Sequence, residues 1–138
     1  MRVLKKYLVI SIIALLYVLT ACSGAMPETA ENTEPGWHTI SAEEALTMME
    51  ESDNYILIDV RTEEEYNALR IEGAILIPDF EIRERAEAEL PDKDATILVY
   101  CRSGRRSASA AEILSSLGYT NVYDIGGIID WPYETVSG

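Results

Sequence analysis

Short, continuous apolar runs alternate with amphipathic stretches along residues 41 to 123. The runs have the length of strands and cover residues 55–58, 74–77, 96–100 and 121–123. The stretches around them place apolar residues at helical intervals and cover residues 41–49, 62–69, 80–90 and 108–117. Continuous apolar strands alternating with helices indicate a parallel sheet covered on both faces. The sequence therefore predicts an α/β fold.

Residues 1–21 have the pattern of an export signal. Three basic residues and no acid precede an apolar run from Tyr7 to Ala21. As a helix this run would span about 22 Å, at 1.5 Å per residue, which is shorter than the ~30 Å bilayer core. A positive start and a short apolar stretch are typical of a cleaved signal peptide, whereas an uncleaved anchor would need a longer run.

The signal ends in Leu19-Thr20-Ala21-Cys22, which resembles the lipobox of bacterial lipoproteins. The resemblance implies that Cys22 is diacylated, with acyl chains such as palmitate, and becomes the new N-terminus. Residues 22–36 are small and polar, with Met26 as the single large apolar side chain, and a flexible tether of this length would reach about 20 Å. We therefore expect an exported, extracytoplasmic domain of residues 37–138, anchored to a bacterial membrane by lipid alone.

The charge balance excludes one class of partner. A chain that begins at Cys22 holds 8 bases and 24 acids, a net charge of -16. Such a polyanion would repel nucleic acid, which proteins bind by neutralising phosphates. One histidine and two distant cysteines form no zinc, haem or iron–sulfur ligand pattern, so we predict no metal. The numbers of histidines and cysteines say nothing about an ion site made of carboxylates alone, which stays open.

The chemistry is predicted to lie in residues 101–107, where a strand gives way to a helix. This is the carboxyl edge of the sheet, where open α/β folds bind ligands. A loop that leads into a helix N-terminus directs backbone N–H groups toward one point, and these donors, the helix dipole and three arginines favour an anion there. They should also lower the pKa of the Cys101 thiol, while Gly104 suits a tight turn. The segment reads Cys101, Arg102, Ser103, Gly104, Arg105, Arg106 and Ser107.

Several short motifs occur in an order that resembles a single-domain rhodanese, a sulfurtransferase module. They are Asp59-Val60-Arg61, residues 71–78, the loop that begins at Cys101, Gly126-Gly127 and Trp131. The resemblance covers about residues 39–133 and implies a three-layer α/β/α fold with a central parallel sheet. The chain departs from the family pattern at Leu69-Arg70, where the family commonly has Gly-His, and at Glu72, where it commonly has Pro.

The resemblance also implies roles for individual residues. Cys101 would form the persulfide, and the backbone from Arg102 to Arg106 would hold the bound sulfur or oxyanion. Arg106 would close the loop and Ser107 would begin the following helix. Asp59, Arg61 and Trp131 match positions that mainly support the site. Read without the resemblance, Arg105 and Arg106 are equally explained as solvated partners of carboxylates, and Trp131 is more simply a core residue.

The expected reaction is the transfer of a sulfane sulfur. The Cys101 thiolate would attack the outer sulfur of a small anionic donor such as thiosulfate and expel sulfite, and a thiol or cyanide-like acceptor would then remove the sulfur. This is covalent catalysis by a nucleophile of lowered pKa, because no histidine stands in the motif. It requires no organic cofactor.

Two other functions are compatible with such a sequence. A phosphatase or arsenate reductase of the same fold would use a longer loop, with five residues between cysteine and arginine. Here four residues separate Cys101 from Arg106, and Ser107 stands where the longer loop has its arginine. The second alternative is a persulfide carrier or binding module with little turnover, which the fold alone does not distinguish from an enzyme.

Overall fold

The computed structural model describes residues 36–138. The predicted signal peptide, Cys22 and nearly all of the predicted tether lie outside the described residues. The helices are α2 (Ala42–Glu51), α3 (Glu63–Ala68), α4 (Ile82–Glu89), α5 (Arg105–Ser116) and the 3-10 helix η1 (Ile128–Asp130). The strands are β1 (Trp37–Thr39), β2 (Tyr55–Asp59), β3 (Ile75–Leu76), β4 (Thr96–Cys101) and β5 (Val122–Gly127). In this part of the chain, no helix is long and apolar enough to cross a bilayer.

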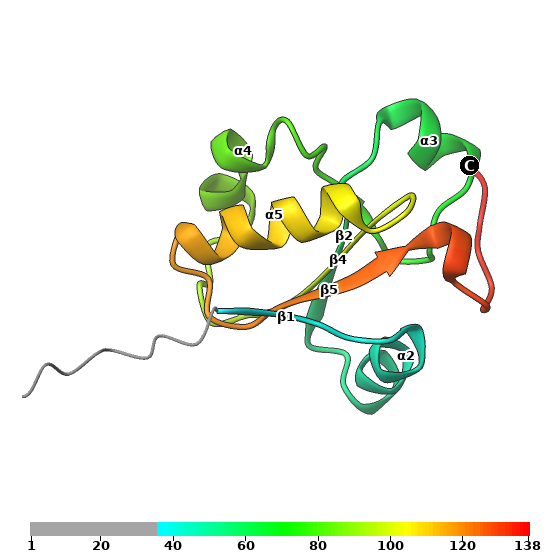
Figure 1. Ribbon diagram of the computed structural model, residues 1–138, viewed down its shortest axis with the longest axis horizontal. Coiled ribbons are helices and arrows are strands. Elements are labelled where there is room, and N and C mark those ends of the chain that lie inside the picture. The colour runs from blue at the N-terminus through cyan, green and yellow to red at the C-terminus, as the bar shows by residue number, and fades with distance from the viewer. Residues whose placement is uncertain (1–35) are drawn as a thin grey trace, which may run out of the picture. The chain divides into compact units, whose positions relative to one another are not determined.

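The five strands form one sheet in the order β1-β5-β4-β2-β3, and every pairing is parallel. The carboxyl ends of all strands therefore meet at one edge, with β4 in the centre. Figure 1 shows α4 and α5 on one side of this sheet and α2 on the other. The α/β prediction with a central parallel sheet between helical layers is confirmed.

Alternation along β4 divides the core between the two faces. Ile97, Val99 and Cys101 belong to the cluster under α4 and α5, whereas Leu98 and Tyr100 belong to the cluster that α2 covers. This is the period of two that a strand imposes on its side chains. It directs the Cys101 side chain toward α5.

The structure corrects several predicted boundaries. Helix α5 begins at Arg105, three residues before the predicted start, because Gly104 adopts a left-handed φ of 96° and turns the chain directly into the helix. Strand β5 continues to Gly127, and neither β1 nor η1 was predicted. The three residues of β1 carry too little apolar pattern to indicate a strand. Phe80, predicted to belong to a helical apolar face, precedes α4 and is exposed.

Candidate active site

Cys101 is the last residue of β4, and only 1% of its surface is exposed. The chain then turns through residues 102–104 into α5. The left-handed conformation of Gly104 directs its backbone N–H back toward the strand end, where it donates to Cys101 Sγ at 3.0 Å. The sulfur therefore lies at the bottom of a loop, with a backbone donor already aimed at it.

The pKa of the Cys101 thiol is below its ordinary value. Burial raises this pKa, but interaction with the hydroxyl and N–H of Ser107 and with the N–H groups of Gly104 and Ser103 together lowers it by more, and the Gly104 N–H is the donor that hydrogen-bonds the sulfur. These donors stabilise the thiolate and not the thiol. The predicted lowering of the thiol pKa is confirmed, and its main cause is the donors of the loop and the first turn of α5.

Strand β5 and η1 form a wall behind the loop. The N–H of Ile129 donates to the carbonyl oxygen of Arg102 at 3.2 Å. A Cβ atom on Gly127 would lie 2.6 Å from Ser103 Cα and closer still to the Arg102 carbonyl oxygen. The Ser107 hydroxyl, 3.0 Å from the Gly104 carbonyl and 3.3 Å from that of Gly126, links loop, helix and wall. Gly126-Gly127 thus allows the wall to approach the loop backbone.

The arginines differ in their surroundings. Arg102 and Arg105 are exposed, and within residues 36–138 neither forms an ion pair. Arg106 instead makes two hydrogen bonds to Glu65 of α3, Nη1 to Oε2 at 2.9 Å and Nη2 to Oε1 at 2.8 Å. The expectation that Arg106 closes the loop and Ser107 begins the helix is wrong. Both lie in the first turn of α5, because Gly104 ends the loop early.

Glu65 is a site residue that the sequence analysis missed. It belongs to a capping box at the start of α3, in which it accepts from the Thr62 N–H and Thr62 Oγ1 accepts from its own N–H. The hydrogen bonds from Arg106 lower the pKa of Glu65 to about 2, although burial raises it. The Thr-x-x-Glu spacing of the capping box was a signal in the sequence, but the partner 41 residues away was not.

Asp59 and Arg61 form a buried ion pair at the end of β2. Arg61 Nε lies 2.9 Å from Asp59 Oδ1 and Arg61 Nη2 lies 2.6 Å from Asp59 Oδ2, and Arg61 Nη2 also donates to the Leu69 carbonyl. The Arg61 guanidinium lies 5.5 Å from the centre of the Tyr100 ring, and the Tyr100 hydroxyl accepts from the Ile71 N–H at 3.1 Å. The pair thus braces the β2 end beside β4 on the face away from Cys101.

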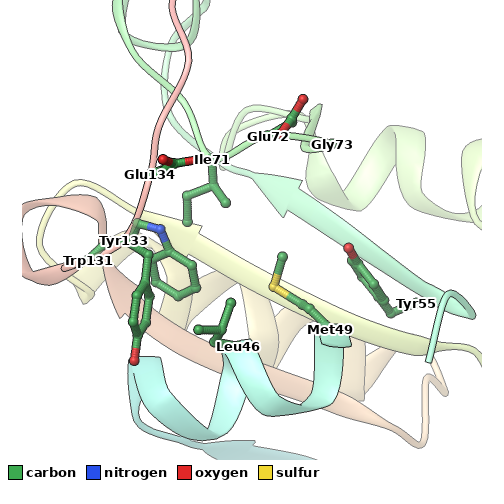
Figure 2. A pocket seen from close by; sticks show the side chains of 9 residues that line it. All are labelled: Leu46, Met49, Tyr55, Ile71, Glu72, Gly73, Trp131, Tyr133 and Glu134. Atoms are coloured by element: carbon green, nitrogen blue, oxygen red, sulfur yellow. The ribbon is translucent and has the colours of Figure 1, made fainter. Parts of the chain in front are cut away.

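Trp131 lies on that same opposite face, so the structure does not bring it to Cys101. Its indole lines a pocket of about 410 Å³, together with Leu46 and Met49 of α2. Figure 2 shows these side chains around the pocket. Its ring meets that of Tyr133 edge to face, with centroids 5.0 Å apart, and its Nε1–H is buried without a partner in the described part of the chain. Trp131 is therefore a packing residue of the second face.

Across residues 36–138, no group of three or more histidine, cysteine or carboxylate side chains is arranged to hold a metal ion. The site consists of a recessed thiol, backbone N–H groups directed at its sulfur and the N-terminus of α5, a helix of 12 residues. Such an arrangement stabilises a thiolate and any anion that replaces it. Fold and site together define an α/β protein with a buried cysteine at the bottom of a loop whose backbone donors suit an anion.

Comparisons with known proteins agree with this class. The rhodanese-like domain family matches residues 41–132. Thiosulfate sulfurtransferase PspE of Escherichia coli is 47% identical over 81 residues, which are 59% of this chain and 78% of the relative. A sulfurtransferase of Allochromatium vinosum is 36% identical over 93 residues, which are 67% of this chain and 85% of that protein. A solved structure described as a rhodanese with anions from E. coli has a TM-score of 0.58 and 45% identity, covering 61% of this chain and 99% of its own.

The chain belongs to the rhodanese-like domain family, and it is a sulfurtransferase of the rhodanese type. Its match to other relatives is partial. The chain covers 23%, 32% and 28% of three longer proteins, two of them named as adenylyltransferases with a sulfurtransferase function and one as a tRNA uridine hydroxylase.

Proposed function

We propose that the protein moves a sulfane sulfur from a small anionic donor, thiosulfate or a compound like it, to a thiophilic acceptor through a persulfide on Cys101. The observation that carries the proposal is the donor set around Sγ. The Gly104 N–H lies 3.0 Å from the sulfur, and the Ser107 and Ser103 donors lower the thiol pKa with it. A relative named as a thiosulfate sulfurtransferase supports the choice of donor.

In the proposed first step, the Cys101 thiolate attacks the outer sulfur of thiosulfate. A bond forms between Sγ and that sulfur, the sulfur–sulfur bond of the donor breaks, and sulfite leaves with the electron pair. The terminal sulfur then carries the negative charge that Sγ carried before. The same loop N–H groups and the helix N-terminus stabilise this charge, so that the intermediate forms without a general base.

In the proposed second step, an acceptor nucleophile such as cyanide or a thiolate attacks the terminal sulfur. The bond between this sulfur and Sγ breaks, and the electron pair returns to Sγ as the thiolate. Neither step needs a metal or an organic cofactor to balance. Arg102 and Arg105, exposed beside the loop, supply positive charge for an arriving anion.

The test is intact-mass spectrometry of the full chain carrying Cys22→Ala, in which Cys101 is the remaining cysteine. Exposure to thiosulfate should add the mass of one sulfur atom, and cyanide should remove it. Cys101→Ser is the matched control, since its side chain is similar in size, and it should fold but gain no mass. If folded, reduced protein gains no sulfur from any donor, the proposal fails. An adduct that forms without multiple turnovers would instead support the persulfide carrier.

We also propose that residues 1–21 are a cleaved signal and that Cys22 carries a lipid that anchors the domain outside the cytoplasm. The support is the sequence pattern alone: the basic start, the short apolar run and the Leu19-Thr20-Ala21-Cys22 motif.

A further inference from the structure

Two large apolar side chains stand exposed at the carboxyl edge of the sheet, where the loop of Cys101 lies. Phe80 is 71% exposed and Ile129 is 63% exposed, more than any other large apolar side chain in residues 36–138. Single exposed apolar residues are common on protein surfaces. Here, however, the two most exposed apolar side chains both belong to segments whose backbones bond to residues just beyond the ends of β4 and β2.

Backbone hydrogen bonds place these segments. Ile129 donates its N–H to the Arg102 carbonyl in the loop itself, at 3.2 Å. Phe80 follows Asp79, whose N–H donates to the Val60 carbonyl just beyond β2, at 2.9 Å. Strands β5 and β2 are the two neighbours of β4 in the sheet. Ile129 and Phe80 therefore border the Cys101 loop from opposite sides.

The charges around the opening of the Cys101 loop are of both signs, and two of the carboxylates there are paired. Glu81 pairs with Arg85 at 2.6 Å, and Glu65 pairs with Arg106. Asp79 lies close enough to Arg106 to contribute to the raised pKa of its guanidinium. In the described part of the chain, the exposed charges of residues 101–107 without an ion-pair partner are two cations, Arg102 and Arg105, whereas three exposed carboxylates without an ion-pair partner, Glu63, Glu64 and Asp130, lie on the neighbouring α3 and η1. The loop segment itself is therefore cationic on a strongly acidic chain.

The sulfur itself is recessed, because Cys101 is 1% exposed. Cyanide or a small thiol can reach such a sulfur without touching Phe80 or Ile129. A protein can reach it only with a cysteine on a projecting tip, and the residues beside that cysteine would then meet the rim. An apolar rim with unpaired guanidinium groups suits neighbours that are apolar and acidic.

We propose that the sulfur acceptor is a thiol protein that presents a cysteine on a projecting tip, flanked by apolar and acidic residues, and docks on Phe80 and Ile129. This inference rests on the proposed sulfurtransferase function. Arg102 and Arg105 receive the carboxylates of the tip. The acceptor thiolate attacks the terminal sulfur of the Cys101 persulfide, the bond from that sulfur to Sγ breaks, and the electron pair stays on Sγ. The acceptor leaves as a persulfide, so atoms and charge balance.

The test uses the full chain with Cys22→Ala, loaded with sulfur from thiosulfate, and three synthetic peptides as acceptors. Each peptide has a central cysteine. In the first the cysteine is flanked by leucine and glutamate on both sides, in the second serine replaces leucine, and in the third lysine replaces glutamate. Transfer to each peptide and to cyanide is compared between this protein, a variant with Phe80→Ser and Ile129→Ser, and a control with Ile75→Ser. Ile75 is an exposed apolar residue on the edge strand β3.

We expect the first peptide to be the best acceptor, and its kcat/KM to fall about five- to ten-fold in the double variant, as expected when a small docking contact is removed. In the double variant the first peptide should no longer be a better acceptor than the second, in which serine replaces leucine. The third peptide, with lysine in place of glutamate, should be a poor acceptor for all three proteins. Ile129 contacts the loop through its backbone N–H, which Ile129→Ser keeps, so the rate with cyanide should remain unchanged in the double variant. Ile75→Ser should change neither rate. This pattern supports the docking surface.

Other results overturn the inference in distinguishable ways. If the peptides are equivalent, or if their preference survives in the double variant, Phe80 and Ile129 do not form the docking surface although sulfur transfer to cyanide continues. If the loaded protein transfers no sulfur to cyanide, the proposed function itself fails. If the protein binds vesicles of anionic phospholipid and the double variant does not, the patch contacts the membrane and not a protein.

Discussion

Glu65 of α3 and Arg106 of α5 join two helices across the mouth of the Cys101 loop by two hydrogen bonds of 2.8 and 2.9 Å. A planar guanidinium that meets a carboxylate at two points fixes the orientation of both groups. Because Arg106 lies two residues after Gly104, this pair holds the first turn of α5, which supplies the donors to Cys101. Glu65 is therefore a positioning residue for the loop.

Replacement of Glu65 by Gln should separate this role from helix capping, since Gln can also complete a capping box. The pKa of Glu65 is about 2, which is below its ordinary value. The ion pair therefore stabilises the fold fully at pH values above the ordinary carboxyl pKa, and this stabilisation is lost as the pH falls toward 2. We expect Glu65→Gln to lower the free energy of unfolding by about 1 kcal/mol at pH 7, discounted for solvent screening. Urea unfolding at pH 7 and near pH 2 measures this.

The difference between Glu65→Gln and the wild type should shrink toward pH 2, where the wild-type carboxyl is also protonated. Equal stability at pH 7 would show that the pair contributes nothing. Glu63→Gln, an exposed position in the same first turn, is the control and should leave unfolding nearly unchanged.

Ser107→Ala should raise the pKa of the Cys101 thiol, because Ser107 supplies the largest of the hydrogen bonds that lower it. The pH profile of alkylation by iodoacetamide should move to higher pH, and sulfur transfer at pH 7 should fall about three-fold, the effect expected from loss of one modest hydrogen bond. Ser109→Ala, an exposed serine further along α5, is the matched control. An identical alkylation profile for Ser107→Ala and wild type would contradict the role of the hydroxyl.

Gly127→Ala should disturb the loop by direct collision. Its added Cβ would lie 2.6 Å from Ser103 Cα, which is backbone and cannot rotate away. We expect a loss of stability of about 1 to 3 kcal/mol, as in other overpacked sites, together with a loss of sulfur transfer. Gly118→Ala is the comparison, because Gly118 has a φ of 93° but open space around it. It should cost about 1 kcal/mol from backbone strain alone and leave transfer intact.

The elements that could be predicted best from the sequence are those whose pattern lies within a few neighbouring residues. Strand β4 was predicted because four apolar residues, Ile97 to Tyr100, follow one another. Helix α2 was predicted because Ser41 and Glu44 match a capping box, which the structure contains. The position of the loop that begins at Cys101 could be predicted because a strand pattern, a glycine and a helix pattern follow one another there in the sequence. Strand β1 was missed because it is a short edge strand whose pairing with β5 depends on residues about 85 positions away.

The parts of the site that depend on distant partners could not be predicted in this way. Nothing near Arg106 indicates that its carboxylate partner is Glu65, and the sequence supplied many other acids. Gly127 was recognised only as part of the Gly126-Gly127 motif, and the contact between the Ile129 N–H and the Arg102 carbonyl was not predicted. The roles of Cys101, Arg102, Ser103, Gly104 and Arg105 in sulfur transfer stay predictions, although the structure supplies the geometry that these roles require.

Cys22→Ala should abolish lipid attachment and leave an unprocessed or differently processed precursor, because the acylated cysteine is the predicted processing site. Metabolic labelling with a radioactive fatty acid such as palmitate, followed by electrophoresis, measures this. Wild type and Cys101→Ser should both be labelled, so that loss of label reports Cys22 and not cysteine in general. Label that persists on Cys22→Ala would remove the proposed anchor.

The buried ion pair of Asp59 and Arg61 lies on the face away from Cys101, so its contribution to the stability of the fold can be tested without changing a contact of the sulfur. The Asp59 side chain is fully buried and that of Arg61 is 5% exposed. Arg61→Met would leave the Asp59 carboxylate unpaired in the core, and removal of one partner from a buried pair costs about 3 to 5 kcal/mol. We expect that loss in urea unfolding at pH 7, where an unpaired buried carboxylate is least tolerated.

A second change should recover much of the stability that Arg61→Met loses. In the double variant Asp59→Leu and Arg61→Met, no charge remains buried, and an apolar pair of similar volume often equals a buried ion pair in stability. The Leu69 carbonyl still loses the donor that Arg61 Nη2 provides, so recovery should be incomplete. If the double variant is no more stable than Arg61→Met, the loss comes from the missing Leu69 hydrogen bond and Tyr100 contact and not from the stranded charge. If both variants unfold like wild type, the pair does not brace the β2 end.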